Sequence, residues 1–167
     1  MYKNEEKKKE KQIVLEEKNG GFKCCYCKQW VLFSEFMGTA HRNHCSFCLW
    51  SKHVDTRPGD RKAECGSRMK PIGLTFKKEG VDRYGQERQG ELMLIHECFG
   101  CGKISINRIA ADDDSEVIVE ILNKSKELSL EKIAELEKND IKVLTKKEKS
   151  EVIIQLFGKN PKKNSAC

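Results

Sequence analysis

Six of the nine cysteines in this 167-residue chain occur as Cys-x-x-Cys pairs, and no other feature limits its possible folds so strongly. A two-residue spacing lets both sulfurs of a tight turn face one tetrahedral ion, while backbone amides in the turn hydrogen-bond the thiolates. Three such pairs in one chain predict a fold organised around bound metal. The pairs are Cys24/Cys27, Cys45/Cys48 and Cys98/Cys101.

The first two pairs predict a complete zinc site. Seventeen residues separate them, within the spacing of about 15–20 residues that is typical of four-cysteine zinc sites. A redox dithiol or a chance cluster would not explain two pairs at this separation. We therefore expect a structural Zn²⁺ held by Cys24, Cys27, Cys45 and Cys48.

The third pair, Cys98/Cys101, needs two more ligands for a second zinc. Cys65 is the obvious third ligand, but Arg68 stands where its partner is expected, and an arginine does not bind a cation. His53 precedes Cys65 by twelve residues and is our preferred fourth ligand. His96 is the alternative, although ligands two residues apart on one strand lie about 6.5 Å apart, which strains a shared ion.

The composition also favours a fold that is stabilised by bound metal. Hydrophobic residues make up 38% of the chain and charged residues 35%, so a single large core is not expected, and a small domain of this kind needs a staple. The Lys/Glu-rich start is not a secretory signal, and no apolar run reaches the roughly 18 residues of a membrane span. We expect a cytoplasmic protein without a membrane partner, whose thiols stay reduced and bind zinc.

Changes in charge, cysteine content and apolar spacing along the chain divide it into three segments: a charged N-terminal tail (1–20), a zinc-binding domain (21–114) and a helical C-terminal extension (115–167). Alternating apolar residues predict strands at 71–76, 91–98 and 103–109, with a glycine-containing loop over 77–90. The predicted fold class is small α+β: a zinc-ribbon-like β domain with two zinc sites and a C-terminal helical appendage.

Three helices are predicted in the extension from apolar spacing and N-cap signals. The first follows an Asp/Ser cap and carries Val117 to Leu122. The second is opened by Ser129. The third begins at a capping box, Thr145 to Glu148, and ends at Gly158.

The motif RNHCSFCLWSKHVDTRPGDR (42–61), with CGSRMKPIGL (65–74) and HECFGCGKISINRIAADDD (96–114), resembles the RNHCP domain family of small bacterial proteins. Ser46 stands where the family name has proline, which removes no ligand. The resemblance covers about residues 22–114 and supports the cysteine assignments. It implies that seven further residues belong to the family's motif, and it implies no particular activity: His44, His53, Asp55, Pro58, Gly59, Asp60 and Arg61.

Basic and aromatic residues in the same stretch predict a nucleic-acid-binding surface. Pro58 and Gly59 are typical of a turn, whose backbone Asp60 would hydrogen-bond. Around it, cations would contact phosphates and an aromatic ring would stack on a base. We expect RNA or a ribonucleoprotein as partner, although Trp50 packing in a small core is an equally good interpretation. The predicted contacts are Arg42, Lys52, Arg57, Arg61, Lys62 and Trp50.

Two other functions remain open from the sequence. If the second zinc had three protein ligands and a water, His53 and Asp55 beside it could serve a metal-dependent hydrolase or nuclease. We name no catalytic residue on this basis, and a non-enzymatic role is favoured. Alternatively, the helical extension could dock a protein partner, which would make the chain an interaction adaptor.

Overall fold

The structure is a computed structural model that describes residues 20–33, 42–57 and 60–158. It is a small α+β fold with two antiparallel sheets and three C-terminal helices. The two-stranded sheet pairs β1 (Gly21–Lys23) with β2 (Trp30–Leu32). The four-stranded sheet has the order β3-β4-β5-β6 and is built from β3 (Ser51–Lys52), β4 (Arg68–Val81), β5 (Glu87–Cys98) and β6 (Ile104–Arg108).

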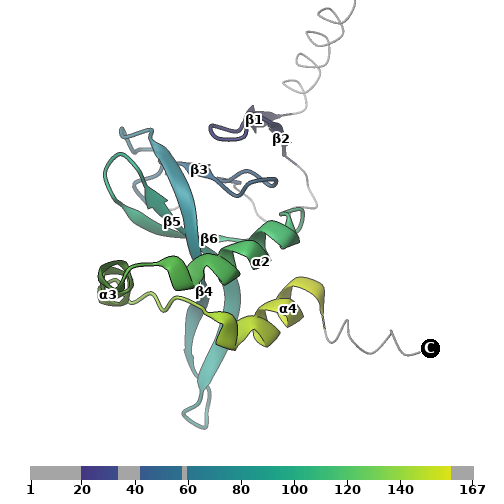
Figure 1. Cartoon of the computed structure of the whole chain (residues 1–167), viewed down its shortest axis with the longest axis vertical. Helices are drawn as coiled ribbons and strands as arrows, with labels where there is room; N and C mark the ends of the chain where they lie inside the picture. The colour runs from purple at the N-terminus through teal and green to yellow at the C-terminus, as the bar shows by residue number, and fades with distance from the viewer. Residues whose placement is uncertain (1–19, 34–41, 58–59, 159–167) are drawn as a thin grey trace, which may run out of the picture.

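The β4–β5 hairpin is the longest element of the molecule (Figure 1). Both strands are longer than the sequence predicts, because residues expected in a loop over 77–90 continue the pairing to Val81 and resume it at Glu87. The turn between them is closed by Asp82, whose carboxylate accepts hydrogen bonds from the amides of Tyr84 and Gln86. The loop expectation was therefore wrong outside Asp82–Gln86.

Three helices follow the sheet: α2 (Ser115–Lys124), α3 (Leu130–Lys138) and α4 (Lys149–Phe157), with 3₁₀ turns η2 (Ser125–Glu127) and η3 (Lys146–Glu148). The predicted N-caps are confirmed. The carboxylate of Asp114 accepts from two amides of α2, Ser129 caps α3, and the capping box of Thr145 and Glu148 is present. No helix in the described part of the chain is long and apolar enough to cross a bilayer.

Helices α2 and α4 lie across the hairpin and share its core (Figure 1). The amide of Leu144 donates to the carbonyl of Leu74 at 2.8 Å, so the segment between α3 and α4 also follows β4. One buried cluster thus joins the sheet to the helical segment. Its members are Leu49, Leu74, Leu92, Leu94, Ile118, Ile121, Leu122, Leu144 and Val152.

The β1–β2 ribbon has a much smaller interior. Its buried cluster contains only Cys24, Val31 and Cys45, with Phe22, Cys27 and Cys48 packed against them. Four of these six residues are cysteines, so the ribbon cannot be held mainly by apolar burial.

Candidate metal centres

Each Cys-x-x-Cys pair forms a turn with the same backbone hydrogen bond, and we refer to these turns as knuckles. The amide of the first cysteine donates to the carbonyl five residues later, at distances of 2.8 Å for Cys24→Gln29, 2.9 Å for Cys45→Trp50 and 2.9 Å for Cys98→Lys103. The residue after the second cysteine has a left-handed backbone in all three: Lys28 (φ 66°), Leu49 (φ 62°) and Gly102 (φ 72°). The repeated geometry directs both sulfurs of each knuckle to the same side.

The first two knuckles face each other and form one cluster. The sulfurs of Cys24 and Cys48 are 3.5 Å apart, and those of Cys27 and Cys45 are 3.6 Å apart. All four sulfurs lie within 4.8 Å of one another. A tetrahedron with Zn–S bonds of about 2.3 Å has edges of about 3.8 Å, so the four-cysteine cluster has the right size for such an ion.

The third knuckle forms the second cluster with His53 and Cys65. The sulfurs of Cys65 and Cys98 are 3.7 Å apart, and His53 Nδ1 lies 3.3 Å from the sulfur of Cys101. The four ligand atoms again lie within 4.8 Å of one another. The structure thus brings together one histidine and three cysteines that come from three separate segments.

Backbone contacts explain how His53 and Cys65 reach this knuckle. The amide of His53 donates to Ser67 O at 2.8 Å, and the amide of Gly66 donates to His53 O at 2.9 Å. Gly100 makes the approach possible, because a Cβ at that position would lie 2.2 Å from the Ser67 hydroxyl oxygen. A side chain at position 100 would therefore push the Cys65 segment away.

His96, the alternative ligand, lies outside the cluster. Its side chain is fully buried, its Nε2 donates to Leu49 O at 2.7 Å, and its Nδ1 accepts from the Asn107 amide at 2.8 Å. Burial, with the nearby His44 ring, lowers the pKa of His96 to about 3. Both nitrogens of this neutral ring are already used, so none is left for a metal ion.

In each cluster the pKa of one cysteine is lowered, whereas burial and neighbouring thiols raise the pKa values of Cys27, Cys48 and Cys98. A hydrogen bond from the Cys48 thiol lowers the pKa of Cys45 to about 5, and the pKa of Cys48 is correspondingly raised. The Ser67 hydroxyl and amide lower the pKa of Cys65 to about 6, with a further contribution from His53. Protons shared among clustered thiols are displaced when a cation binds, so this donor set suits a thiophilic metal.

The Arg-Asn-His triplet before Cys45 is part of a buried polar network. Arg42 forms ion pairs with Asp112 and, at 3.1 Å, with Asp113. The His44 ring contacts Asp113 at 2.6 Å. The guanidinium side chain of Arg42 is fully buried, so our expectation that Arg42 contacts phosphate must be corrected. The sequence feature that could have indicated this burial is the acidic run 112–114, which lies about seventy residues from Arg42 and supplies its partners.

Asp60 hydrogen-bonds the backbone around it, as predicted, whereas Pro58 and Gly59 of the expected turn lie outside the described residues. The Asp60 carboxylate accepts hydrogen bonds from the amides of Thr56, Arg57 and Lys62. Asp55 accepts from the amide of Arg61 at 2.9 Å and lies 3.6 Å from its guanidinium. Asp55 and Asp60 thus shape the loop, while the side chains of Arg57 and Lys62 remain exposed.

Trp50 connects the knuckles through aromatic contacts. Its ring stacks on Tyr26 with centroids 4.0 Å apart and meets the edge of Phe99 at 5.5 Å. The exposed fractions are 49% for Tyr26 and 61% for Phe99. One face of Trp50 is therefore already covered, and the aromatic surface open to a ligand belongs to Tyr26 and Phe99, which the sequence analysis did not select.

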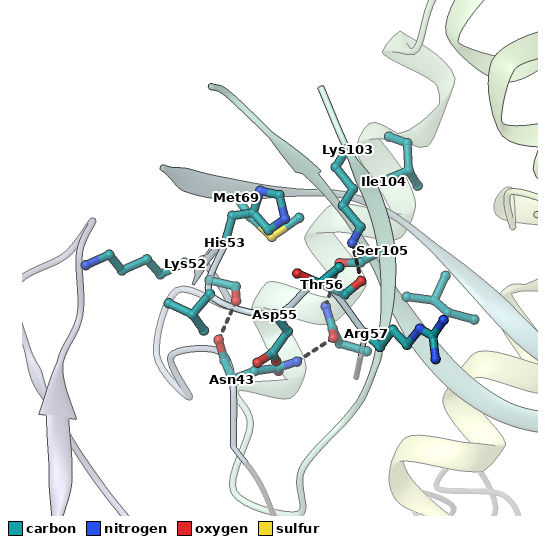
Figure 2. Close-up of a pocket in the computed structure, with 14 residues that line it drawn as sticks. Asn43, Lys52, His53, Asp55, Thr56, Arg57, Met69, Lys103, Ile104 and Ser105 are labelled. Atoms are coloured by element: carbon teal, nitrogen blue, oxygen red, sulfur yellow. Dashed lines mark hydrogen bonds between the residues drawn. The ribbon is translucent and has the colours of Figure 1, made fainter. Parts of the chain in front are cut away.

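Two adjoining hollows flank the segment Ser51–Val54. One, of about 230 Å³, lies between residues 51–57 and β6 (Figure 2). The other, of about 330 Å³, lies between that segment and the β1–β2 ribbon. Apart from the internally paired Arg42, five cations and one carboxylate, Asp55, line them. The cations are Lys23, Lys52, Arg57, Arg61 and Lys103.

The sequence and the two clusters together define a cysteine-rich fold that could hold two metal ions. Residues 19–119 match the RNHCP domain. Because the match covers more than half of the chain, the protein belongs to the RNHCP domain family. No curated protein and no solved structure matches the chain.

Proposed function

We propose that this protein is a two-zinc module that binds single-stranded RNA along the two hollows beside residues 51–57. The observation that carries the proposal is the charge of these hollows, where five cations meet a single carboxylate. Over the whole chain, 32 basic residues face 26 acidic ones. The surface beside the clusters is therefore far more positive than the average surface, as expected for contact with phosphates.

Zinc is the metal that the donors favour. Seven thiolates and one imidazole are soft and borderline ligands, and tetrahedral S₄ or S₃N sets are typical of structural zinc. We expect two zinc ions per chain, measured by native mass spectrometry on protein purified without added metal. The first would be held by Cys24, Cys27, Cys45 and Cys48, and the second by His53, Cys65, Cys98 and Cys101.

The RNA surface combines cations with exposed rings. Lys52, Arg57, Arg61 and the neighbouring Lys62 are the proposed phosphate contacts, and the hollows add Lys23 and Lys103. Bases would stack on the open rings of Tyr26 and Phe99, since stacking on aromatic side chains stabilises single strands without sequence preference. Arg42 has no part in this surface, and Trp50 supports it by holding Tyr26.

The test is fluorescence anisotropy of the zinc-loaded full chain with a labelled single-stranded RNA over a range of salt concentrations. Lys52→Gln with Arg57→Gln should weaken binding by roughly 1–3 kcal/mol. For a single strand, the slope of log K against log salt should fall by about 0.7 for each contact removed. Lys126→Gln with Lys147→Gln, two exposed lysines of the helical segment, removes the same charge and is the matched control.

Equal weakening by both double variants would mean that only net charge matters, and it would contradict the assigned surface. Absence of salt-sensitive binding to any RNA would overturn the RNA proposal altogether. Zinc content and melting temperature are measured for each variant, so that a damaged fold is not mistaken for a lost contact.

The geometry supports the two alternatives less well. A hydrolytic zinc needs an open coordination position, whereas four protein ligands converge at the second cluster and His53 is one of them. An adaptor would use apolar faces of the helices, but the buried apolar residues of α2 and α4 pack in the core shared with the sheet. The exposed apolar side chains of the described helices are Leu130, Ile154 and Phe157. Leu130, which is 84% exposed, stands apart from that core.

A further inference from the structure

We propose that the hollow between residues 51–57 and β6 binds one nucleotide, with its base inside and its phosphate on a cationic rim (Figure 2). The inference rests on the proposed function in one respect: the nucleotide is taken to be one unit of the bound RNA strand. It adds a defined pocket for a single base, which neither the charge of the surface nor its exposed rings requires.

The size and walls of the hollow suit one flat ring system. Its volume is about 230 Å³, whereas sites that enclose whole drug-sized ligands have about 300–1,000 Å³. Its apolar side chains are Val54 from the Ser51–Arg57 segment and Met69 from β4. β6 closes the other side with Ser105 and its backbone, because Ile104 and Ile106 lie on the opposite face of the strand. A base is the part of a nucleotide that would gain from burial against Val54 and Met69.

The rim supplies charge for a phosphate. Arg57 and Lys103 line the hollow, and neither has a carboxylate partner among the described residues. The Lys103 ammonium donates to Thr56 O at 2.5 Å, a neutral acceptor. Figure 2 shows Lys52 leading away from this hollow, so the two other cations would meet the phosphate. Asp55, the only acid present, is already matched by Arg61.

Groups able to recognise a base edge also surround this hollow, which we call the slot. β6 is an edge strand, and alternate residues of an edge strand keep amide and carbonyl groups that the sheet does not use. The Ser105 hydroxyl oxygen accepts from Asn107 and retains its own proton for donation. The Asn43–Asn107 amide pair is saturated by its internal hydrogen bonds and forms a fixed wall.

The direct test is an NMR titration of the ¹⁵N-labelled, zinc-loaded full chain with the four ribonucleoside 5′-monophosphates. At least one should shift amides within 53–57 and 104–107, at a concentration tenfold or more below that needed for inorganic phosphate. Nucleosides without phosphate should bind more weakly at the same amides. If phosphate alone matches the nucleotides, or if no amide of β6 responds, the slot does not hold a base.

A variant localises the effect. Ser105→Glu places a carboxylate in the slot, because Ser105 lies on the same face of β6 as Lys103, and Ser150→Glu at an exposed position of α4 is the matched control. The first should weaken nucleotide binding tenfold or more, and the second less than twofold, with zinc content unchanged in both. Lys103→Gln provides a second variant if Ser105→Glu fails to fold. Equal effects of the slot and control variants would overturn the proposal.

The slot and the RNA surface can fail separately. If RNA binds with its full salt dependence but Ser105→Glu leaves that affinity unchanged and mononucleotides do not bind, the slot is wrong and the RNA function stands. If mononucleotides bind the slot but no RNA binds, the slot stands and the RNA function is wrong.

Discussion

Two regions of this protein hold their backbones together by different means. The body, made of β4, β5, β6 and the helices, buries nine apolar side chains in one cluster. The lobe, made of the β1–β2 ribbon and the second knuckle, buries only Cys24, Val31 and Cys45. Apolar burial contributes about 25 cal/mol for each Å² removed from water. The body therefore has an ordinary core, whereas the lobe has in its place a cluster of four cysteines that could hold a metal ion.

The second cluster lies between the two regions. Cys98 and Cys101 belong to the turn after β5, while His53 follows β3 and Cys65 precedes β4. Leu49 adds an apolar link, because it follows Cys48 directly but packs in the large cluster of the body. A metal bound at these clusters would therefore matter most for the folding of the lobe and least where the helices cover the sheet.

The largest expected effect is that of metal removal. Structural zinc supplies apparent binding energies of about 10 kcal/mol or more, which is also folding energy. Chelation, or Cys45→Ser, should expose amides of residues 21–32 and 44–52 to hydrogen exchange while those of β4, β5 and α2 stay protected. Mass spectrometry of peptic fragments reads this out. Simultaneous loss of protection over the whole chain would erase the distinction between lobe and body.

The buried ion pair between the regions ranks second. Arg42→Ala would leave Asp113 buried without its partner, and breaking a buried pair in this way costs about 3–5 kcal/mol. Chemical denaturation should show this loss in zinc-loaded protein. Arg42→Lys, which keeps the charge, should lose less. If Arg42→Ala instead kept its stability and lost RNA affinity, the side chain would be a ligand contact after all.

Core truncation sharpens the contrast within each region. Leu94→Ala in the body should cost about 3 kcal/mol, through lost burial and a residual cavity. Val31→Ala in the lobe should cost about 1.5 kcal/mol and leave the zinc content unchanged. Equilibrium denaturation of both variants in the zinc-loaded state makes the measurement. A larger loss at Val31 than at Leu94 would mean that the lobe depends on apolar packing.

The smallest effect is expected at the contact between the lobe and α2. Asp114 caps this helix through two amides, and its own amide donates to Ser46 O at 2.9 Å in the second knuckle. Asp114→Ala should cost about 1 kcal/mol, the usual value for a lost N-cap, whereas Asp114→Asn should cost almost nothing. Thermal unfolding of the zinc-loaded variants tests both values.

Local patterns in the sequence were sufficient for the knuckles and the helices. The Cys-x-x-Cys spacing identified the cysteines that cluster, because both partners of each pair lie within one turn. The helix starts at Asp114, Ser129 and Thr145 were predictable for the same reason, since a cap and the amides that donate to it are at most three residues apart. These features depend on contacts that are short in sequence.

Features that depend on distant partners were harder to predict. Arg42 looked like a surface cation because its acids lie about seventy residues away. His53 and His96 were both possible ligands until the fold sent one ring to Cys101 and the other to Leu49 O. The ends of β4 and β5 carry exposed polar residues on both faces, so no hydrophobic alternation marked them as strands.

The position of α2 has a consequence for how this family is divided into units. The match to the RNHCP domain ends at residue 119, five residues into a helix that continues to Lys124. Ile121 and Leu122, which belong to the same buried cluster as Leu74 and Leu94, lie beyond that point. The segment that matches the family is therefore smaller than the unit that shares one buried core. Any relative that carries only the matched segment must shield the same sheet face with helices of its own or with a second chain.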